Sequence, residues 1–450
     1  MNYQETTEYL FNSTPVFEKI GAKAYKPGLQ TTFALDDHFG HPHQKYKTIH
    51  IAGTNGKGSS SHTLAAILQS QGYKVGLYTS PHLVDFRERI RVNGECVPEQ
   101  YVIDFVEENR AFFEPLHPSF FELTTAMALK YFAEQEVDYA VIEVGLGGRL
   151  DCTNIITPIL SIITNISFDH TQFLGNTLAE IAGEKAGIIK PGVPVVIGEY
   201  LPETRPVFEN KAKAENAPIL FAQDFDADHL ESSETCDVDM ELKGSYQERN
   251  KKTILTALLI LRQKLAISDE AIREGFAHVC ELTGLRGRWE KLNDAPLTIC
   301  DTGHNLAGWN YLAPQINSVK AETKHIVFGM VDDKDVVHVL QLLKEKLENR
   351  VKYYWTQPST KRAIPVEKLS ELALKFGLHG ETYHSVKEAY NAALKNAKKD
   401  DFVFKEIDQR SADFLRALHL LNSCPCSSVA HFSYLLEVLT GDNRLVRIGK

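Results

Sequence analysis

Cysteine is scarce in this 450-residue chain, which has seven cysteines spread from Cys96 to Cys426. An odd and sparse count is atypical of a disulfide-stapled secreted domain, so we expect a protein of the reducing cytosol. Long apolar runs are missing too, since no stretch reaches the roughly 18 residues that a membrane-spanning helix needs. The first residues also lack the basic start and apolar core of an export signal. The sequence therefore predicts a cytoplasmic protein without a membrane partner.

Positive charge is in short supply, because 49 lysines and arginines face 59 acidic residues and leave a net charge of −10. Such a chain repels a phosphate polymer, which argues against a nucleic-acid partner. An anionic small molecule would have to meet a local cationic site. Hydrophobic residues at 43% and charged residues at 24% are typical of globular proteins, and the length predicts two or three domains.

Apolar strand-type runs alternate with helical patterns from residue 48 onward, beginning with strand 48–53, helix 57–71 and strand 74–80. The later runs have a near-continuous apolar character, which suits strands buried on both faces of a parallel sheet. They are 138–145, 158–166 and 193–198, and helices are predicted at 99–114, 177–187, 247–265 and 269–279. A second strand and helix series begins at 297 and predicts a smaller α/β domain.

A glycine-rich loop joins the first strand to the first helix, with the sequence Gly53-Thr54-Asn55-Gly56-Lys57-Gly58-Ser59. Glycines allow backbone N–H groups to point at an anion, the helix N-terminus adds positive potential, and Lys57 can reach the terminal phosphates. The spacing departs from the ordinary phosphate loop, because only two residues separate the first glycine from Gly56-Lys57. Strand, turn, lysine and helix together nevertheless favour nucleotide binding over a plain connecting turn.

The predicted fold class is therefore α/β, with an N-terminal P-loop ATPase domain that has a mostly parallel sheet and a smaller, Rossmann-like C-terminal domain. The boundaries that we predict are 1–285 for the ATP-binding domain, 286–296 for a linker, 297–404 for the second domain and 405–450 for an atypical tail.

Four further motifs, in this order, carry a family resemblance: TSPHLVDFRERIRVNGE from 79, EVGLGGRLDCTN from 143, ITNISFDHTQFLGNT from 163 and IAGEKAGIIKPG from 181. With the glycine-rich loop, they make the chain resemble the folylpolyglutamate synthase/dihydrofolate synthase family of Mur ligases over about residues 26–401. The resemblance implies an ATP-dependent ligase that adds L-glutamate to dihydropteroate, to a folate or to both, through an acyl phosphate.

Candidate metal ligands lie where apolar strands end, since Ser80, Glu143 and His170 each follow such a run and parallel strands deliver these ends to one edge. Mg²⁺ prefers oxygen ligands and few protein contacts. The resemblance implies two Mg²⁺ sites, one at Ser80 and Glu143 and the other at His170. It also implies a carbamylated Lys185 that supports the metal, whereas a lysine in such a helix is usually solvated. Lys57, Glu143, His170 and Lys185 are the predicted catalytic residues.

Further ligand contacts come from the resemblance alone. For the nucleotide it implies contacts from Asn250, Arg288 and Asp301 in addition to the loop residues 53–59. For the pteroate or folate it implies contacts from Gly28, Leu29, Gln30, Ser119, Phe120, Phe121, Leu150, Asp151 and Cys152. An aromatic side chain among these can stack on a flat pterin. Relatives usually have alanine where Cys152 stands.

Two alternative functions stay open at this point. One is a cell-wall amino-acid ligase of the same superfamily, and the other is a nucleotide-binding homologue without ligase activity. The second is kept because residues 405–450 show no correspondence to the family. We expect a monomer with the small-molecule substrates ATP, L-glutamate and dihydropteroate or folate. The sequence leaves open which folate is preferred and how many glutamates are added.

Overall fold

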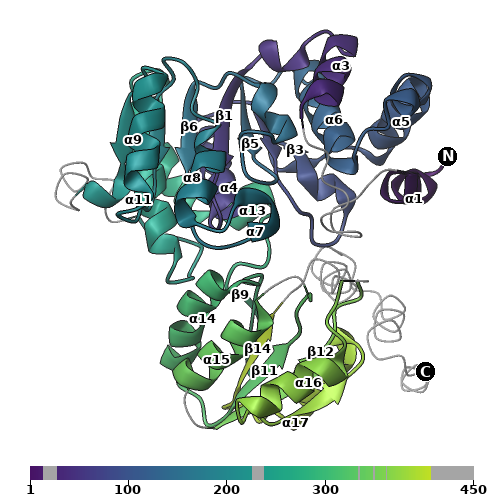
Figure 1. The fold of residues 1–450 in the computed structure, drawn as a ribbon, viewed down its shortest axis with the longest axis vertical. Coiled ribbons are helices and arrows are strands. Elements are labelled where there is room, and N and C mark those ends of the chain that lie inside the picture. The colour runs from purple at the N-terminus through teal and green to yellow at the C-terminus, as the bar shows by residue number, and fades with distance from the viewer. Residues whose placement is uncertain (14–27, 226–237, 333–334, 348–349, 361, 407–450) are drawn as a thin grey trace, which may run out of the picture.

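The computed structural model describes residues 1–13, 28–225, 238–332, 335–347, 350–360 and 362–406. They form two α/β domains stacked along the long axis of the molecule, with the larger N-terminal domain above the smaller C-terminal domain in Figure 1. None of the described helices is long and apolar enough to cross a membrane.

The first domain is built on an eight-stranded sheet with the order β4-β3-β2-β5-β1-β6-β7-β8. The parallel strands are β1 (Lys47–Ala52), β2 (Val75–Tyr78), β5 (Tyr139–Glu143), β6 (Leu160–Ile163), β7 (Val195–Ile197) and β8 (Ile219–Phe221). Strands β3 (Ile90–Val92) and β4 (Glu95–Cys96) add an antiparallel edge. The predicted parallel sheet is thus confirmed, with a short antiparallel extension.

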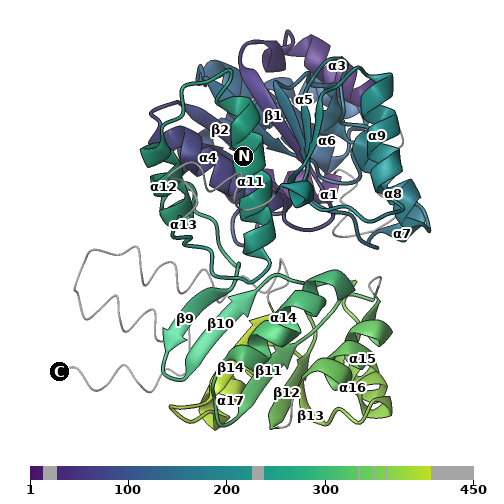
Figure 2. The same cartoon turned by 90° about the vertical axis from the view of Figure 1, so that its left-hand side faces the viewer.

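Helices cover both faces of this sheet (Figure 2). On one face α4 (Lys57–Ser70), α11 (Gln247–Leu261) and α12 (Asp269–Ala277) pack on Ile49 and Ile51 of β1. The other face packs against α1 (Tyr3–Ser13), α3 (Gln30–His38), α5 (Glu99–Phe113), α6 (Phe120–Glu134), α8 (Leu178–Ala186) and α9 (Arg205–Ala214). The short helices α7 (Thr171–Leu174) and α13 (Val279–Thr283) complete the domain. Burial on both faces explains the near-continuous apolar runs.

The second domain has a six-stranded sheet with the order β13-β12-β11-β14-β10-β9. Its strands are β9 (Glu290–Asp294), β10 (Leu297–Asp301), β11 (Lys324–Phe328), β12 (Val351–Thr356), β13 (Gly380–Tyr383) and β14 (Phe402–Glu406), and all but β9 are parallel. Its helices are α14 (Leu306–Ser318), α15 (Val336–Lys346), α16 (Val366–Lys375) and α17 (Val386–Asn396).

Two of the predicted domain boundaries do not coincide with the ends of strands. The segment 286–296 that we predict as a linker contains β9, which pairs with β10 in the second sheet. Strand β14 continues two residues beyond the predicted end of the second domain, to Glu406. The remaining residues of the predicted tail, 407–450, lie outside the described residues.

The position of β1 determines where a ligand can bind. Strand β1 lies between β5 and β6, and its chain leaves through α4 to β2 on the far side of β5. In open α/β sheets such a reversal of strand order leaves a crevice beyond the carboxyl ends of the strands. The glycine-rich loop follows β1, Glu143 is the last residue of β5, and residues 164–170 follow β6. The loop and Asp169 contact Asn305 of the second domain.

Candidate active site

The glycine-rich loop is fixed by hydrogen bonds to the segment that follows β6. The backbone amide of Thr54 donates to the carbonyl of Asn165 at 3.0 Å, and the amide of Asn55 donates to the Asn165 side chain at 2.9 Å. Gly53 and Gly56 have φ values of 150° and 86°, a region that residues with a Cβ rarely adopt. Gly56 is the N-cap of α4, so the helix N-terminus opens directly onto the loop. This arrangement suits a bound phosphate.

Three predicted side chains surround the loop. A Cβ built on Gly56 would lie 2.4 Å from Oδ1 of Asn250. A Cβ on Gly58 would lie 3.2 Å from an Arg288 guanidinium nitrogen and 3.9 Å from a Glu143 carboxylate oxygen. Residues far apart in sequence therefore meet at the N-terminus of α4, and Gly56, with its positive φ, leaves the space that Asn250 occupies.

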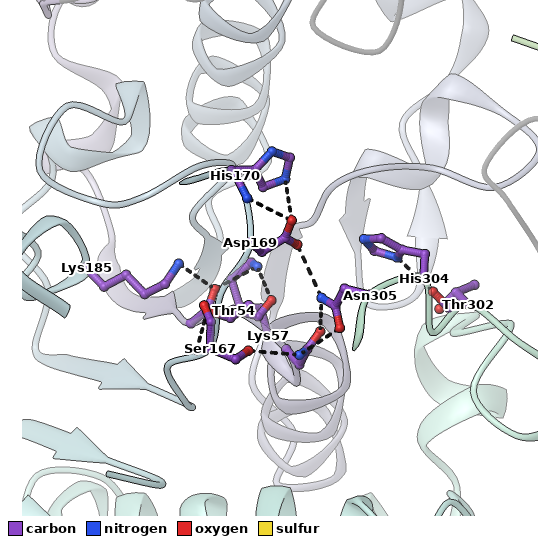
Figure 3. A network of polar contacts seen from close by, with 11 residues as sticks. Thr54, Lys57, Ser167, Asp169, His170, Lys185, Thr302, His304 and Asn305 are labelled. Atoms are coloured by element: carbon purple, nitrogen blue, oxygen red, sulfur yellow. Dashed lines mark hydrogen bonds and ion pairs between the residues drawn. The ribbon is translucent and has the colours of Figure 1, made fainter. Parts of the chain in front are cut away.

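Two lysine side chains donate hydrogen bonds to the loop. The ammonium of Lys57 donates to the carbonyls of Gly53 at 2.9 Å and Thr54 at 3.2 Å, and the amine of Lys185 donates to the same Gly53 carbonyl at 3.1 Å (Figure 3). Lys185 is buried, and burial together with the charge of Lys57 lowers its pKa to about 7. The prediction that Lys185 lies in the site is supported by this geometry, and the usual solvated lysine is excluded.

Glu143 and Ser80 lie together at the sheet edge. The Ser80 amide donates to Oε2 of Glu143 at 3.2 Å, and the Glu143 side chain is almost completely buried. Burial raises the pKa of this carboxyl, while Lys57, the Ser80 amide and Arg288 oppose the shift. A buried carboxylate beside a hydroxyl at the mouth of a phosphate loop is a chemically suitable ligand set for Mg²⁺.

His170 lies on the other side of the loop. It adopts a left-handed conformation, with φ of 50°, at the start of α7, and its amide donates to Oδ1 of Asp169 at 2.9 Å. His170, Asp169 and Lys185 line the same cavity. Among the described residues, the only trio of mutually close potential ligands is Asp36, Asp37 and His41, which lies away from that cavity. The two predicted Mg²⁺ positions thus offer few protein ligands each, as Mg²⁺ bound to nucleotide phosphates requires.

A cavity of about 310 Å³ joins the loop to the second domain. Seven of the nine predicted substrate residues line it, together with Gly53, Thr54, Lys57 and Ser80. The seven are Gly28, Ser119, Phe120, Phe121, Leu150, Asp151 and Cys152. Leu29 and Gln30, at the start of α3, do not line it. The second domain contributes His304, Gly329, Met330, Val331, Arg362 and Glu406.

Asp301 is held by hydrogen bonds at the junction of the linker and the second domain. It is buried at the end of β10, and its carboxylate accepts hydrogen bonds from the Tyr246 hydroxyl at 2.7 Å, the Trp289 amide at 2.8 Å and the Gly303 amide at 2.8 Å. Burial raises its pKa. It lines neither the main cavity nor the smaller cavity of about 110 Å³ beside Arg288, so in this structure it ties the linker to the second domain.

Sequence reasoning missed two polar residues in the site. Asn305 caps α14 and its amide nitrogen donates to Asn55 Oδ1 at 3.0 Å and to Asp169 Oδ2 at 3.2 Å, so it connects the two domains (Figure 3). Asp169 directly precedes the predicted metal ligand His170, so a search for carboxylates near that ligand would have found it. No local signal marks Asn305 beyond its role as a helix cap.

A phosphate loop, buried acidic and basic groups and a cavity closed by a second α/β domain define the class of ATP-dependent ligases with this two-domain architecture. Sequence profiles agree: the Mur ligase middle domain matches residues 51–220, and the Mur ligase glutamate ligase domain matches residues 287–404. The chain belongs to the folylpolyglutamate synthase/dihydrofolate synthase family of Mur ligases.

Individual relatives support that assignment. The folylpolyglutamate synthase of Lacticaseibacillus casei is 34% identical over 388 residues, which cover 81% of this chain and 88% of the relative. The structure of E. coli FolC in complex with DHPP and ADP superposes with a TM-score of 0.81 at 30% identity, covering 94% of this chain and 99% of the other. A bifunctional folylpolyglutamate synthase/dihydrofolate synthase structure with Mn, AMPPNP and L-glutamate bound has a TM-score of 0.77 at 28% identity, with coverages of 93% and 98%.

Proposed function

We propose that this protein is an ATP-dependent ligase that joins L-glutamate to dihydropteroate, to a folate or to both. The observation that carries the proposal is the 310 Å³ cavity, which has the phosphate loop and Lys57 on one wall and Phe121 and Asp151 on another. A flat aromatic heterocycle can bind at the second wall while its acid tail points to the first. The related structures with DHPP and ADP, and with Mn, AMPPNP and L-glutamate, support the same ligand classes.

The reaction that fits this site is acyl-phosphate ligation. The γ-phosphoryl group of ATP passes to the acceptor carboxylate, the glutamate amine then attacks the activated carbonyl, and phosphate leaves with the oxygen it received. The loop amides and Lys57 hold and neutralise the phosphates, and Arg288 approaches from the interdomain connection. No side chain needs to act as a covalent nucleophile, because positioning and charge stabilisation supply most of such a barrier.

Ser80 and Glu143 would hold one Mg²⁺ ion and His170 the second, which would neutralise phosphate charge when bound. We also propose that Lys185 becomes carbamylated. Its pKa of about 7 leaves much of the amine neutral near neutral pH, and a neutral amine reacts with CO₂. The carbamate is an anion, so it would replace one of two close positive charges beside Gly53 by a negative one.

A single assay separates the candidate functions. The purified protein is incubated with ATP, Mg²⁺, labelled L-glutamate and one acceptor: dihydropteroate, tetrahydrofolate or a nucleotide-linked muramyl peptide precursor. Labelled product with either pterin acceptor supports the proposal and shows which ligations occur. Product with the muramyl acceptor alone would instead indicate a cell-wall ligase. ADP binding without product from any acceptor would indicate a homologue that has lost ligase activity.

A further inference from the structure

A histidine is buried in the middle of β1, in a position that the proposed mechanism does not use. His50 has no exposed surface, and its ring points to the face of the sheet opposite to Ile49 and Ile51. Its Nε2 atom lies 2.9 Å from the hydroxyl of Thr153, more than a hundred residues away in sequence. Burying an imidazole in a strand core is costly unless it makes a useful hydrogen bond.

The hydrogen bond continues to the cavity wall. The Thr153 hydroxyl donates to Oδ1 of Asp151 at 2.5 Å, and the Thr153 amide donates to the same oxygen at 3.0 Å. The Leu146 amide donates to the other oxygen, Oδ2, at 2.8 Å. Asp151 is nearly buried but lines the cavity. A chain of polar contacts therefore runs from His50 through Thr153 to a carboxylate at the candidate substrate site.

The donors in this chain have a defined direction. Because the single Thr153 hydroxyl proton is donated to Asp151, the hydroxyl oxygen must accept from His50, so Nε2 carries the proton. Nδ1 of His50 is buried and has no hydrogen-bond partner among the described residues, which a neutral ring tolerates better than a charged one. Burial lowers the pKa of His50 to about 3, in agreement with a neutral ring. Every donor in the chain thus points toward Asp151.

Asp151 lies beside an aromatic ring. A Cβ built on Gly145 would lie 2.4 Å from the Phe121 ring and 3.1 Å from Oδ2 of Asp151, so this glycine allows both groups to reach the cavity. Burial alone raises the pKa of Asp151, while the hydrogen bonds from Thr153 and Leu146 favour the ionised form. A carboxylate fixed by these hydrogen bonds beside an aromatic face suits a flat heterocycle with two adjacent N–H donors on its edge.

We propose that His50 and Thr153 are positioning residues, which hold the Asp151 carboxylate as an oriented acceptor for the amino-pyrimidinone edge of the acceptor substrate. The inference rests on the proposed function, because it takes the ligand of this wall to be a pterin. It assigns no chemical step to His50. Its effect acts on binding of the pterin and leaves nucleotide binding unchanged.

The test uses the full-length protein and two matched pairs of variants. Thr153→Val keeps the shape but removes the hydroxyl, and Thr153→Ser keeps the hydroxyl. His50→Leu removes the donor, and His50→Gln retains one. We expect Thr153→Val and His50→Leu to raise KM for dihydropteroate or tetrahydrofolate about tenfold, with KM for ATP unchanged, and the Ser and Gln variants to stay within about threefold of wild type. If His50→Leu does not fold, the Thr153 pair decides.

A ligand variant sharpens the test. A pteroate in which methyl replaces the 2-amino group loses one donor to Asp151, so it should bind wild type more weakly than dihydropteroate but lose little further affinity in Thr153→Val. The inference would be overturned if Thr153→Val lost equal affinity for both ligands, or if its KM for the pterin substrate equalled that of wild type. Wild-type protein that neither binds nor ligates any pteroate or folate would overturn the proposed function instead, so the two failures are distinguishable.

Discussion

The side-chain amide nitrogen of Asn305 in the second domain lies 3.0 Å from the side-chain oxygen of Asn55 in the phosphate loop. The same nitrogen lies 3.2 Å from Oδ2 of Asp169. Oδ1 of Asn305 accepts a hydrogen bond of 2.8 Å from the Gly308 amide, and in this way Asn305 caps α14. One residue thus starts a helix of the second domain and holds that helix against both the loop and the segment that carries His170. The contact therefore joins the second domain to the phosphate loop of the first domain.

Substitution of Asn305 should uncouple the domains without unfolding either. Asn305→Ser retains a helix cap but cannot reach Asn55, so we expect kcat/KM for ATP to fall about tenfold while stability changes by less than about 1 kcal/mol. Asn305→Asp also retains the cap but faces the Asp169 carboxylate, so its activity should fall further. Steady-state kinetics and urea unfolding measure the two quantities. A wild-type rate in both variants would show that the contact is dispensable.

Lys57 should be essential for phosphoryl transfer. Lys57→Met retains most of the length of the side chain but removes its charge from the mouth of the loop, so we expect ATP turnover to fall by at least about a hundredfold. Coupled detection of ADP measures this. Lys252→Met on α11, where the ammonium donates to the Gln223 carbonyl, is the matched control and should turn over ATP at the wild-type rate. Ligation by Lys57→Met at the wild-type rate would contradict the assignment.

Glu143 should control metal affinity. Glu143→Gln keeps the shape and an acceptor for the Ser80 amide but removes the buried charge, so we expect Mn²⁺ affinity in the presence of ADP to fall about ten- to a hundredfold. Electron paramagnetic resonance of free Mn²⁺ gives this affinity directly. Glu209→Gln on the surface of α9 is the control. If both variants bind Mn²⁺ as wild type does, Glu143 is not a metal ligand.

The carbamate on Lys185 has a direct spectroscopic test. Protein equilibrated with ¹³CO₂ should show one slowly exchanging carbamate signal that Lys185→Ala lacks. We expect Lys185→Ala to lose ligation, and a short carboxylate such as propionate to restore part of it by occupying the vacated space with an anion. The control is Lys190→Ala, since Lys190 donates a hydrogen bond to the Asn154 carbonyl and should not contribute to the carbamate signal. An unchanged spectrum in Lys185→Ala would exclude the carbamate.

Burial of Lys185 also predicts a pH-dependent stability in CO₂-free buffer. Its pKa falls from 10.5 in the unfolded chain to about 7 in the folded one, so between these values the unfolded state binds more protons and stability rises with pH. Lys185→Met has no such group. The free energy of unfolding of Lys185→Met should exceed that of wild type most below pH 7, and this difference should shrink toward pH 10.5. Urea unfolding at pH 6 and pH 9 measures it, and a difference independent of pH would contradict the lowered pKa.

Sequence patterns were sufficient for much of the fold. The apolar runs around β1, β5 and β6 predicted strands buried on both faces, and the loop from Gly53 to Ser59 predicted a phosphate site between strand and helix. Strand β9 escaped prediction, because its exposed, charged sequence from Glu290 to Asp294 has neither a buried run nor clear alternation. Its pairing with β10, rather than its composition, makes it a strand.

By itself, the order of residues determined the strands, the glycine loop and the charged side chains at strand ends, because local periodicity and turn chemistry depend only on near neighbours. Which of those side chains meet was decided by tertiary structure. Asn55 and Asn305 are 250 positions apart and His50 and Thr153 are 103 positions apart, yet the side chains of each pair form a hydrogen bond. Such partners are chosen by packing across the sheet and the domain interface, where separation along the chain carries no information.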